Sequence, residues 1–155
     1  MNKDKYTMLV AKNKKAYFDY DIIDSWEAGI ELKGYEVKSI RGKQVNLKGS
    51  YVIFSGEDIY VKGMHISAYK VLANKKSILV ERERKLFLHK KTISFLKQKT
   101  KESGFSLIPL EIYFKGNLIK VKIALVKGRK NYQKKQVLKE RSMDRDAKMA
   151  MKKYL

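Results

Sequence analysis

The segment 110–125 constrains the fold of this chain more than any other part of the sequence. Its apolar residues occupy every second position on both sides of the dipeptide Gly116-Asn117: Leu110, Ile112, Phe114, Ile119, Val121, Ile123 and Leu125. Such alternation is typical of a strand with one buried face, and a short turn containing glycine is typical of a hairpin. Pro109, the only proline, is expected at the start of this hairpin, where a missing N–H does least harm. The chain therefore contains an antiparallel sheet.

A second hairpin is predicted upstream. Residues 50–54 and 59–62 are rich in β-branched and aromatic side chains, and a short loop around Gly56 separates them. Glycines punctuate this region at even intervals: Gly42, Gly49, Gly56 and Gly63. Short strands with evenly spaced turns favour a mainly β fold, either a closed barrel or a sandwich.

Local signals suggest the remaining elements of the first forty residues. The lysine-rich residues 1–12 are expected to form a flexible arm, and the aromatic cluster at 16–20 a first strand. A short helix is predicted over 25–32, because Asp24 offers an N-cap and Glu27 completes a capping box.

Two further elements follow from periodicity. Residues 36–40 read as a strand with Val37 and Lys38 on opposite faces, and residues 90–103 read as a helix that Gly104 ends.

The chain carries a strong excess of positive charge. It has 36 Lys and Arg against 16 Asp and Glu, a net charge of +20. Self-repulsion at this charge is normally offset by a polyanion, which makes a merely soluble, highly charged surface the weaker interpretation. The polyanion is either a nucleic acid or an acidic membrane face. Neither a signal peptide nor an apolar run of membrane-spanning length is found, and a peripheral membrane role would require a basic amphipathic helix with bulky apolar residues opposite. We therefore expect a nucleic acid and no membrane partner.

The sequence offers little for catalysis. There is no cysteine, which excludes disulfides and cysteine-based zinc sites, and His65 and His89 stand in no metal-ligand pattern. Each histidine reads as a surface or turn residue, or as a donor that faces RNA. We therefore expect no enzyme activity, no cofactor and no metal.

Lysines that alternate with apolar residues on strands favour nucleic-acid binding: Lys38, Lys120 and Lys122. Basic groups bind phosphates, and aromatic side chains stack on unpaired bases. Core packing is the better interpretation for most of the aromatic residues, and Tyr35 and Phe18 are the leading exposed candidates. This pattern alone does not separate RNA from DNA.

The last 29 residues differ from the rest. Residues 127–155 hold eleven Lys and Arg and three acids, a net charge of +8, and contain no proline and no glycine after Gly128. Their apolar stripe is thin, which predicts a tail that is disordered alone and helical when it docks on RNA.

An ordered series of short motifs spans the chain from Asn13 to its end. In order, it comprises Asn13-Lys14-Lys15-Ala16, Glu27-Ala28-Gly29-Ile30, Gly34-Tyr35-Glu36-Val37-Lys38-Ser39, Ser50-Tyr51-Val52, His65-Ile66-Ser67, Arg84-Lys85-Leu86-Phe87-Leu88, Lys120-Val121-Lys122-Ile123-Ala124-Leu125 and Lys127-Gly128-Arg129-Lys130. The series resembles the SsrA-binding protein (SmpB) family, the protein partners of transfer-messenger RNA.

The resemblance implies an OB-fold-like closed barrel over 13–126, with short flanking helices, between the arm at 1–12 and the tail at 127–155. It implies binding of the tRNA-like domain of transfer-messenger RNA and its delivery to stalled ribosomes in trans-translation, in the cytoplasm. The tail would occupy the decoding site and the mRNA channel, the ribosome would transfer the peptide, and the protein would act as a monomer on RNA.

Matching positions supply two sets of expected contacts. The transfer-messenger RNA set is Asn13, Lys14, Lys15, Phe18, Glu27, Tyr35, Lys38, Leu86, Lys120 and Lys122. The ribosome-binding tail set is Lys127, Arg129, Lys130, Lys134, Lys135, Arg141, Arg145, Lys148 and Lys152. Glu27 reads equally as a helix cap, and Leu86 reads equally as core support.

The sequence also departs from the family pattern. Gln133-Lys134-Lys135 stands where the family commonly has Asp-Lys-Arg, so an acid is missing while the basic pair remains. Ala68 replaces a proline, and Leu79-Val80 replaces Asp-Pro. Two alternatives stay open: a general ribosome-associated RNA-binding barrel protein, and an RNA-processing enzyme that would depend on His65 or His89.

Overall fold

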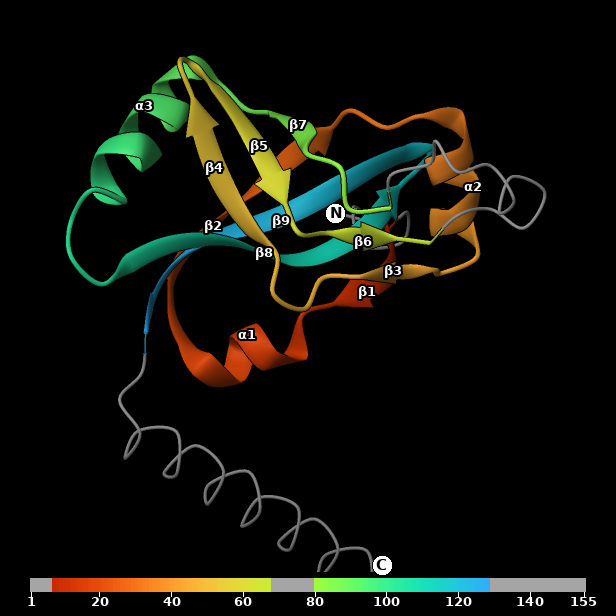
Figure 1. Cartoon of the computed structure of the whole chain (residues 1–155), viewed down its shortest axis with the longest axis horizontal. Helices are drawn as coiled ribbons and strands as arrows, with labels where there is room; N and C mark the ends of the chain where they lie inside the picture. Colours follow the sequence, from red (N-terminus) through yellow and green to blue (C-terminus); the bar gives the residue numbers. More distant parts are fainter. Residues whose placement is uncertain (1–6, 68–79, 129–155) are drawn as a thin grey trace, which may run out of the picture.

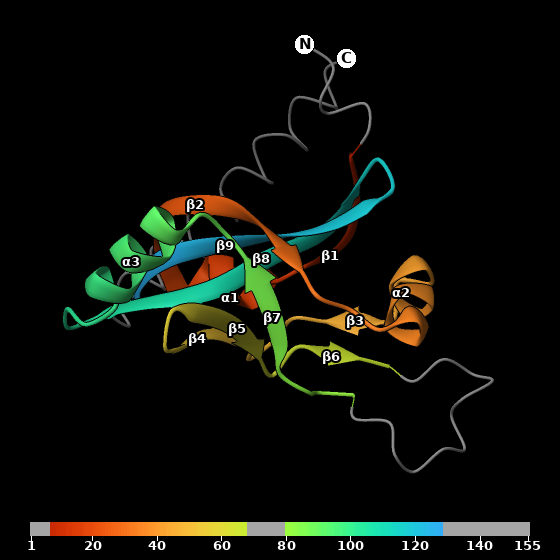
Figure 2. The ribbon, with the colours of Figure 1, turned by 90° about the horizontal axis from the view of Figure 1, so that it is seen from above.

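The computed structural model describes residues 7–67 and 80–128, in which one curved antiparallel sheet carries three short helices (Figure 1). Seven strands form the sheet in the order β1-β8-β9-β2-β7-β5-β4, and β3 pairs with β6 in a separate ribbon. The strands are β1 (Thr7–Lys12), β2 (Tyr20–Ile30), β3 (Val45–Asn46), β4 (Tyr51–Ser55), β5 (Asp58–Lys62), β6 (His65–Ile66), β7 (Arg84–Phe87), β8 (Phe105–Lys115) and β9 (Leu118–Gly128). The helices are α1 (Lys14–Asp19), α2 (Gly34–Arg41) and α3 (Lys90–Lys99). Helices α2 and α3 lie at opposite ends of the molecule (Figure 2).

The elements with the clearest local pattern are confirmed. The predicted hairpins are β8–β9 and β4–β5, and the predicted helix at 90–103 is α3, which ends four residues earlier than expected. Gly104 lies beyond it with φ +87°, a conformation that glycine adopts without strain. Pro109 lies inside β8 rather than at its start, next to a bulge that interrupts the pairing with β9.

The strand predicted at 16–20 is wrong, because this segment begins with helix α1. The Asn13 side chain caps the helix, with its oxygen accepting a hydrogen bond from Ala16 N at 3.2 Å. Ala16 is buried against the sheet with Leu110 and Val126. The cap and this packing outweigh the β-propensity of the aromatic residues.

The helix predicted at 25–32 is also wrong, because this segment belongs to strand β2. Its residues pair with β9 and, at the far end, with β7. The apparent capping pair is separated: Asp24 accepts a hydrogen bond from Ser25 N beside a bulge, and Glu27 projects from the middle of the strand. Pairing with two neighbouring strands outweighs the local capping signal.

The strand predicted at 36–40 is helix α2. Glu36 occupies the third helical position, and its carboxylate accepts a hydrogen bond from Lys33 N at 2.8 Å. The same carboxylate bonds Arg84 Nε of β7 at 2.5 Å, and both side chains are almost fully buried, at 1% and 0% exposure. This long-range ion pair fixes the helix where the local pattern favoured a strand.

The flexible arm predicted at 1–12 needs correction over residues 7–12, which form strand β1. This strand pairs with the second half of β8, with a bulge between Leu9 and Ala11. Pairing along the edge of β8 orders these residues, and their apolar run Met8-Leu9-Val10-Ala11 was the signal that the lysines of the first five residues obscured. The body of the protein therefore begins before Asn13.

The sheet described here is not closed by hydrogen bonds, so the expected closed barrel is not confirmed. Strands β1 and β4 are its two ends, and β4 lies alongside β8 without pairing with it. The first half of β8 pairs on one side with β9 and leaves its other side facing β4. We call the gap between β4 and this half of β8 the seam.

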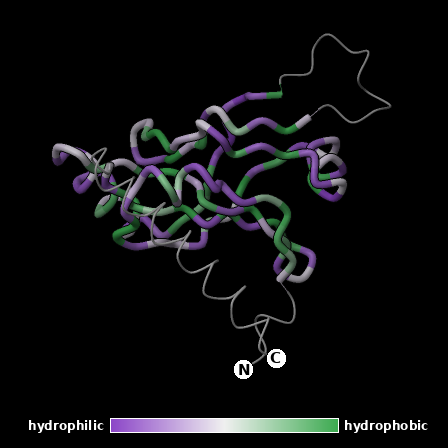
Figure 3. The backbone as a smooth tube through the Cα atoms, turned by 90° about the horizontal axis from the view of Figure 1, so that it is seen from below, coloured by the Kyte–Doolittle hydropathy of each residue, from purple (hydrophilic) through white to green (hydrophobic). Residues whose placement is uncertain are grey.

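The main hydrophobic core fills the inside of the curved sheet. Hydrophobic segments run through the middle of the molecule, and hydrophilic segments dominate its periphery (Figure 3). Leu86 of β7 belongs to this core at 1% exposure, beside Ile59 and Val121. In the part of the chain that the structure describes, no helix has the length and apolar character needed to cross a membrane.

Candidate nucleic-acid interface

Four neighbouring strands, β1, β8, β9 and β2, present one continuous surface on the side of the sheet away from the main core (Figure 2). Cross-strand register aligns Glu27 with Lys122 and Glu111, and the next row aligns Gly29 with Lys120 and Tyr113. The alternate residues, such as Ala28, Val121 and Ile112, are buried in the core. We call the following residues the outer face: Glu27, Phe87, Glu111, Tyr113, Lys115, Lys120 and Lys122.

Glu27 occupies a central position on the outer face. Tyr113 Oη donates a hydrogen bond to its carboxylate at 2.5 Å, and Lys115 Nζ donates another at 3.0 Å. Burial alone would raise the pKa of Glu27, but these two hydrogen bonds outweigh it and leave the pKa below its ordinary value. Burial and the contact with Glu27 raise the pKa of Tyr113. Glu27 is thus an ionised acceptor that orients a lysine and a tyrosine.

Phe87 extends the outer face onto β7. It pairs with Gly29, and a Cβ added to Gly29 would lie 3.3 Å from Phe87 Cβ. Glycine therefore leaves room for the ring to lie against β2, where it remains 50% exposed. Lys85 Nζ lies 5.6 Å from the ring centroid. The result is an exposed aromatic ring with a cation beside it.

A groove of about 490 Å³ runs along the outer face between β1 and β2. Its lining includes Glu27, Glu111, Tyr113, Lys115 and Lys122. Lysines outnumber acids on the outer face, so it attracts anions, while its two glutamates provide fixed acceptors. A phosphate chain that lies over such a surface can meet cations, hydroxyls and an aromatic ring within one short span.

Helix α1 covers the neighbouring end of the same sheet surface. Tyr17 donates a hydrogen bond to Glu111 at 3.2 Å, and burial together with this carboxylate raises the pKa of Tyr17 to about 12. Lys14 and Lys15 are exposed on the helix, and Phe18 is half-buried. The helix therefore borders the outer face with its own positive charge.

Asn13 has an internal role. Its side-chain amide donates to Leu47 O at 3.2 Å and to Pro109 O at 3.1 Å, while its oxygen caps α1. The residue is buried, and its bonds join α1 to both walls of the seam. It positions the elements that carry Lys14 and Lys15.

The structure gathers some of the predicted contact residues and separates others. Glu27, Lys120 and Lys122 share the outer face, as the resemblance implied for a common RNA site. Lys38 and Tyr35 lie on helix α2 rather than on a strand. Lys127 is exposed at the end of β9, near the Phe105 ring, and the other predicted tail residues lie outside the described residues.

Leu86 is core support, and the exposed residue of its motif is the next one, Phe87. Tyr113, Lys115 and Glu111 also lie on the outer face, although they are not among the contact residues expected from the sequence. Tyr113 alternates with the apolar residues of the first predicted strand, so its outward direction followed from the hairpin. No local signal distinguished Phe87 from its apolar neighbours on either side.

The two histidines do not form a joint site. His65 Nδ1 lies 3.6 Å from an exposed Glu81 oxygen, and His89 precedes the first turn of α3. Across residues 7–67 and 80–128, no group of three or more potential metal ligands comes together.

Both the sequence and the structure of this chain are similar to those of known proteins. The family described as SmpB protein matches residues 10–153. The SsrA-binding protein of Listeria welshimeri is 47% identical over 93% of this chain and 93% of its own length, and that of Bdellovibrio bacteriovorus is 43% identical over 88% and 89%. A chain of the solved structure described as "tmRNA-SmpB: a journey to the center of the bacterial ribosome" is 37% identical, with a TM-score of 0.66 over 78% of this chain and 85% of that one. The chain belongs to the SmpB protein family.

Proposed function

We propose that this protein binds the tRNA-like domain of transfer-messenger RNA on the outer face and delivers it to stalled ribosomes for trans-translation. The observation that carries the proposal is the composition of the outer face, where lysines, the aromatic residues Tyr113 and Phe87 and the ionised Glu27 lie together on paired strands. The chain that carries this surface belongs to the SmpB family. The relatives' description as SsrA-binding proteins supports the same partner.

Each group on the outer face has a chemical role in this proposal. Lys120 and Lys122 bind phosphates, and Phe87 stacks on an unpaired base. The Glu27 carboxylate accepts a hydrogen bond from a 2′-hydroxyl or a base edge, and of these two contacts the one with the 2′-hydroxyl favours RNA over DNA. Folding thus prepares a surface for one structured RNA before the RNA arrives.

The remaining parts of the proposal concern the tail and the cell. The tail at 127–155 binds the decoding site and the mRNA channel through its dense positive charge. The protein acts in the cytoplasm as a monomer on RNA and performs no catalysis, because the ribosome transfers the peptide. The proximity of β4 and β8 supports an OB-fold-like barrel as the scaffold.

Replacing Phe87 with alanine should weaken binding of the tRNA-like domain by about 1–3 kcal/mol, roughly tenfold or more in Kd. The reason is the loss of a stacking surface while the buried Leu86 remains in place. The matched control is Phe95→Ala, which removes an aromatic side chain of similar exposure from α3, outside both described grooves. Electrophoretic mobility shift at constant salt measures both Kd values. Equal losses in the two variants would remove Phe87 from the RNA site.

Binding of the same RNA should weaken steeply with salt, because each phosphate contact releases counterions. The double variant Lys120→Gln/Lys122→Gln should reduce the slope of log K against log salt by about 2. Lys90→Gln/Lys91→Gln removes equal charge from the first turn of α3, which lines neither described groove, and should leave the slope nearly unchanged. If both double variants reduce the slope equally, the salt dependence comes from the net charge of the protein rather than from the outer face.

Sequencing of RNA that copurifies with the full chain tests the proposal as a whole. The expected result is enrichment of an RNA with a tRNA-like domain. Enrichment of ribosomal RNA alone would instead support a general ribosome-associated barrel protein.

A further inference from the structure

The seam between β4 and β8 is a second groove, separate from the outer face. It has a volume of about 770 Å³, and none of its lining residues also lines the outer-face groove. It exists because the first half of β8 has no partner on the side that faces β4. The hydrogen bonds of Asn13 to Leu47 O and Pro109 O join its two walls at one end.

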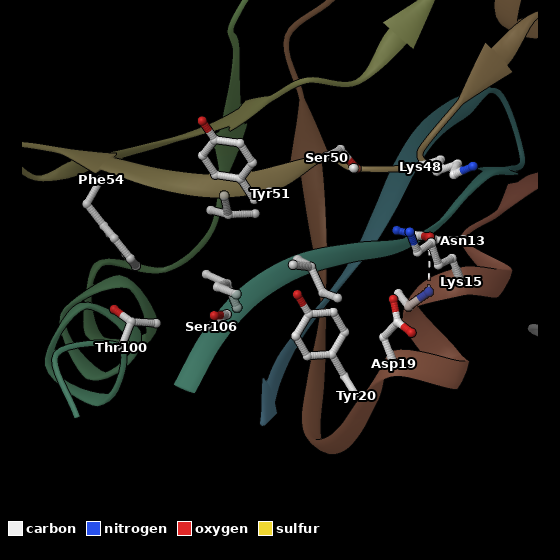
Figure 4. A pocket seen from close by; sticks show the side chains of 15 residues that line it. Asn13, Lys15, Asp19, Tyr20, Lys48, Ser50, Tyr51, Phe54, Thr100 and Ser106 are labelled. Carbon is white, nitrogen blue, oxygen red and sulfur yellow. Dashed lines mark hydrogen bonds between the residues drawn. The ribbon is translucent and has the colours of Figure 1, made fainter. Parts of the chain in front are cut away.

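Figure 4 shows the side chains that line the seam. Tyr51 of β4 and Tyr20 of β2 lie on opposite sides of it, and Lys15 and Lys48 lie at one end, where the carboxylate of Asp19 also lines the groove. Ser106 belongs to the β8 wall. Aromatic faces, a hydroxyl and a pair of cations within one groove match the base, the sugar and the phosphate of a nucleotide.

The polar groups of these side chains are available to a ligand. Among the described residues, Lys15 and Lys48 make no ion pair, and the hydroxyls of Tyr20, Tyr51 and Ser106 make no hydrogen bond. Tyr51 is also 43% exposed, so its ring is accessible from the groove. Donors that have no internal partner and face a groove are suited to acceptors on a bound molecule.

We propose that the seam binds an unpaired nucleotide of single-stranded RNA, with the base against Tyr51 and the phosphate between Lys15 and Lys48. Because the seam and the outer face share no lining residue, the nucleotide binds while the outer face holds a structured RNA. An extended peptide could instead add a strand to the free edge of β4. The paired lysines favour an anionic ligand over such a peptide.

Fluorescence anisotropy with a labelled hexauridylate RNA and the full chain tests this proposal, which does not rest on the proposed function. Tyr51→Ala should weaken hexauridylate binding about tenfold, through the loss of one stacked base. Tyr51→Phe keeps the ring and should retain most of the binding, and Phe95→Ala, which removes an exposed ring from α3 outside both grooves, should bind hexauridylate normally. Unchanged binding by Tyr51→Ala, or an equal loss in Phe95→Ala, would overturn the proposal.

Two further measurements separate the possible outcomes. Photo-crosslinking with 4-thiouridine in the hexanucleotide should label peptides that contain Tyr20 or Tyr51, and labels confined to Phe87 and Tyr113 would refute the seam. A saturating tRNA-like RNA should leave the Tyr51-dependent binding in place, whereas its displacement would refute independence. If the tRNA-like RNA itself does not bind, the proposed function fails and the hexauridylate result still stands.

Discussion

Replacing Glu36 with glutamine should lower the free energy of unfolding by about 3–5 kcal/mol, because it leaves a charged arginine buried without its counter-ion. Arg84 is 0% exposed and donates to Glu36, to Met64 O at 2.7 Å and to Val80 O at 3.1 Å. Arg82 also contacts the Glu36 carboxylate. Removing this one charge therefore disrupts the contact between α2 and β7 at several bonds.

Urea unfolding followed by circular dichroism measures this loss. The matched control is Glu31→Gln, an exposed glutamate in the link between β2 and α2, which should change stability by less than about 0.5 kcal/mol. The double variant Glu36→Leu/Arg84→Met should be more stable than Glu36→Gln alone, because no charge is then left buried. Equal effects of Glu36→Gln and Glu31→Gln would show that the buried ion pair contributes little.

The same ion pair gives stability a defined dependence on pH. Burial alone would raise the pKa of Glu36, but hydrogen bonds from Arg82 and Lys33 N and the charge of Arg84 lower it below the ordinary value of 4.5. A group whose pKa is lower in the folded state stabilises the fold above its unfolded pKa and loses that contribution as pH falls through the folded value. The stability difference between wild type and Glu36→Gln should therefore shrink as pH falls below about 4.5.

The sequence predicted the elements whose signals are local. The hairpin β8–β9 and helix α3 were recognised because alternation, turn glycines and helical periodicity lie within a few residues of each other. The segment 16–40 was misread throughout, since each of its elements depends on a distant partner. Helix α2 depends on Arg84, and β2 depends on β9 along most of its length.

The expected RNA-contact residues also divide into those that a local pattern could place and those that depend on distant pairing. Lys120 and Lys122 were correctly placed on one face of a strand, because the alternation of the hairpin fixes which residues share a face. The choice between Leu86 and Phe87 could not be made in the same way, because three apolar residues in a row leave the phase of a strand undetermined. Only the pairing of Phe87 with Gly29 settles which side chain faces outward.

The net charge indicated the kind of partner but not where on the protein that partner binds. The net charge of +20 indicated a polyanion, but lysines and aromatic residues line both the seam and the outer-face groove, so charge alone does not locate a binding site. Tyr51 is on a strand that the sequence predicted, yet its exposure, like that of Phe87, depends on neighbours far away in the chain. Surfaces of this kind require the three-dimensional arrangement.

Truncation after Gly128 should leave binding of the tRNA-like domain largely intact and abolish peptide tagging on stalled ribosomes. All outer-face residues lie before Gly128, on strands that pair with one another without residues 129–155. Residues 1–128 keep a net charge of +13, which is enough to attract the RNA. Mobility shift measures RNA binding, and translation of a message without a stop codon measures tagging.

A full-length variant separates the charge of the tail from its length. Replacing Arg141, Arg145, Lys148 and Lys152 with glutamine keeps every residue of the chain and removes four of the eleven tail cations. If the tail binds ribosomal RNA through its charge, this variant should tag poorly while binding the tRNA-like domain normally. Loss of RNA affinity after truncation to the level of Phe87→Ala would contradict the division into two RNA-binding parts. Normal tagging by the four-residue variant would shift the role of the tail from charge to its apolar residues, such as Met143 and Met151.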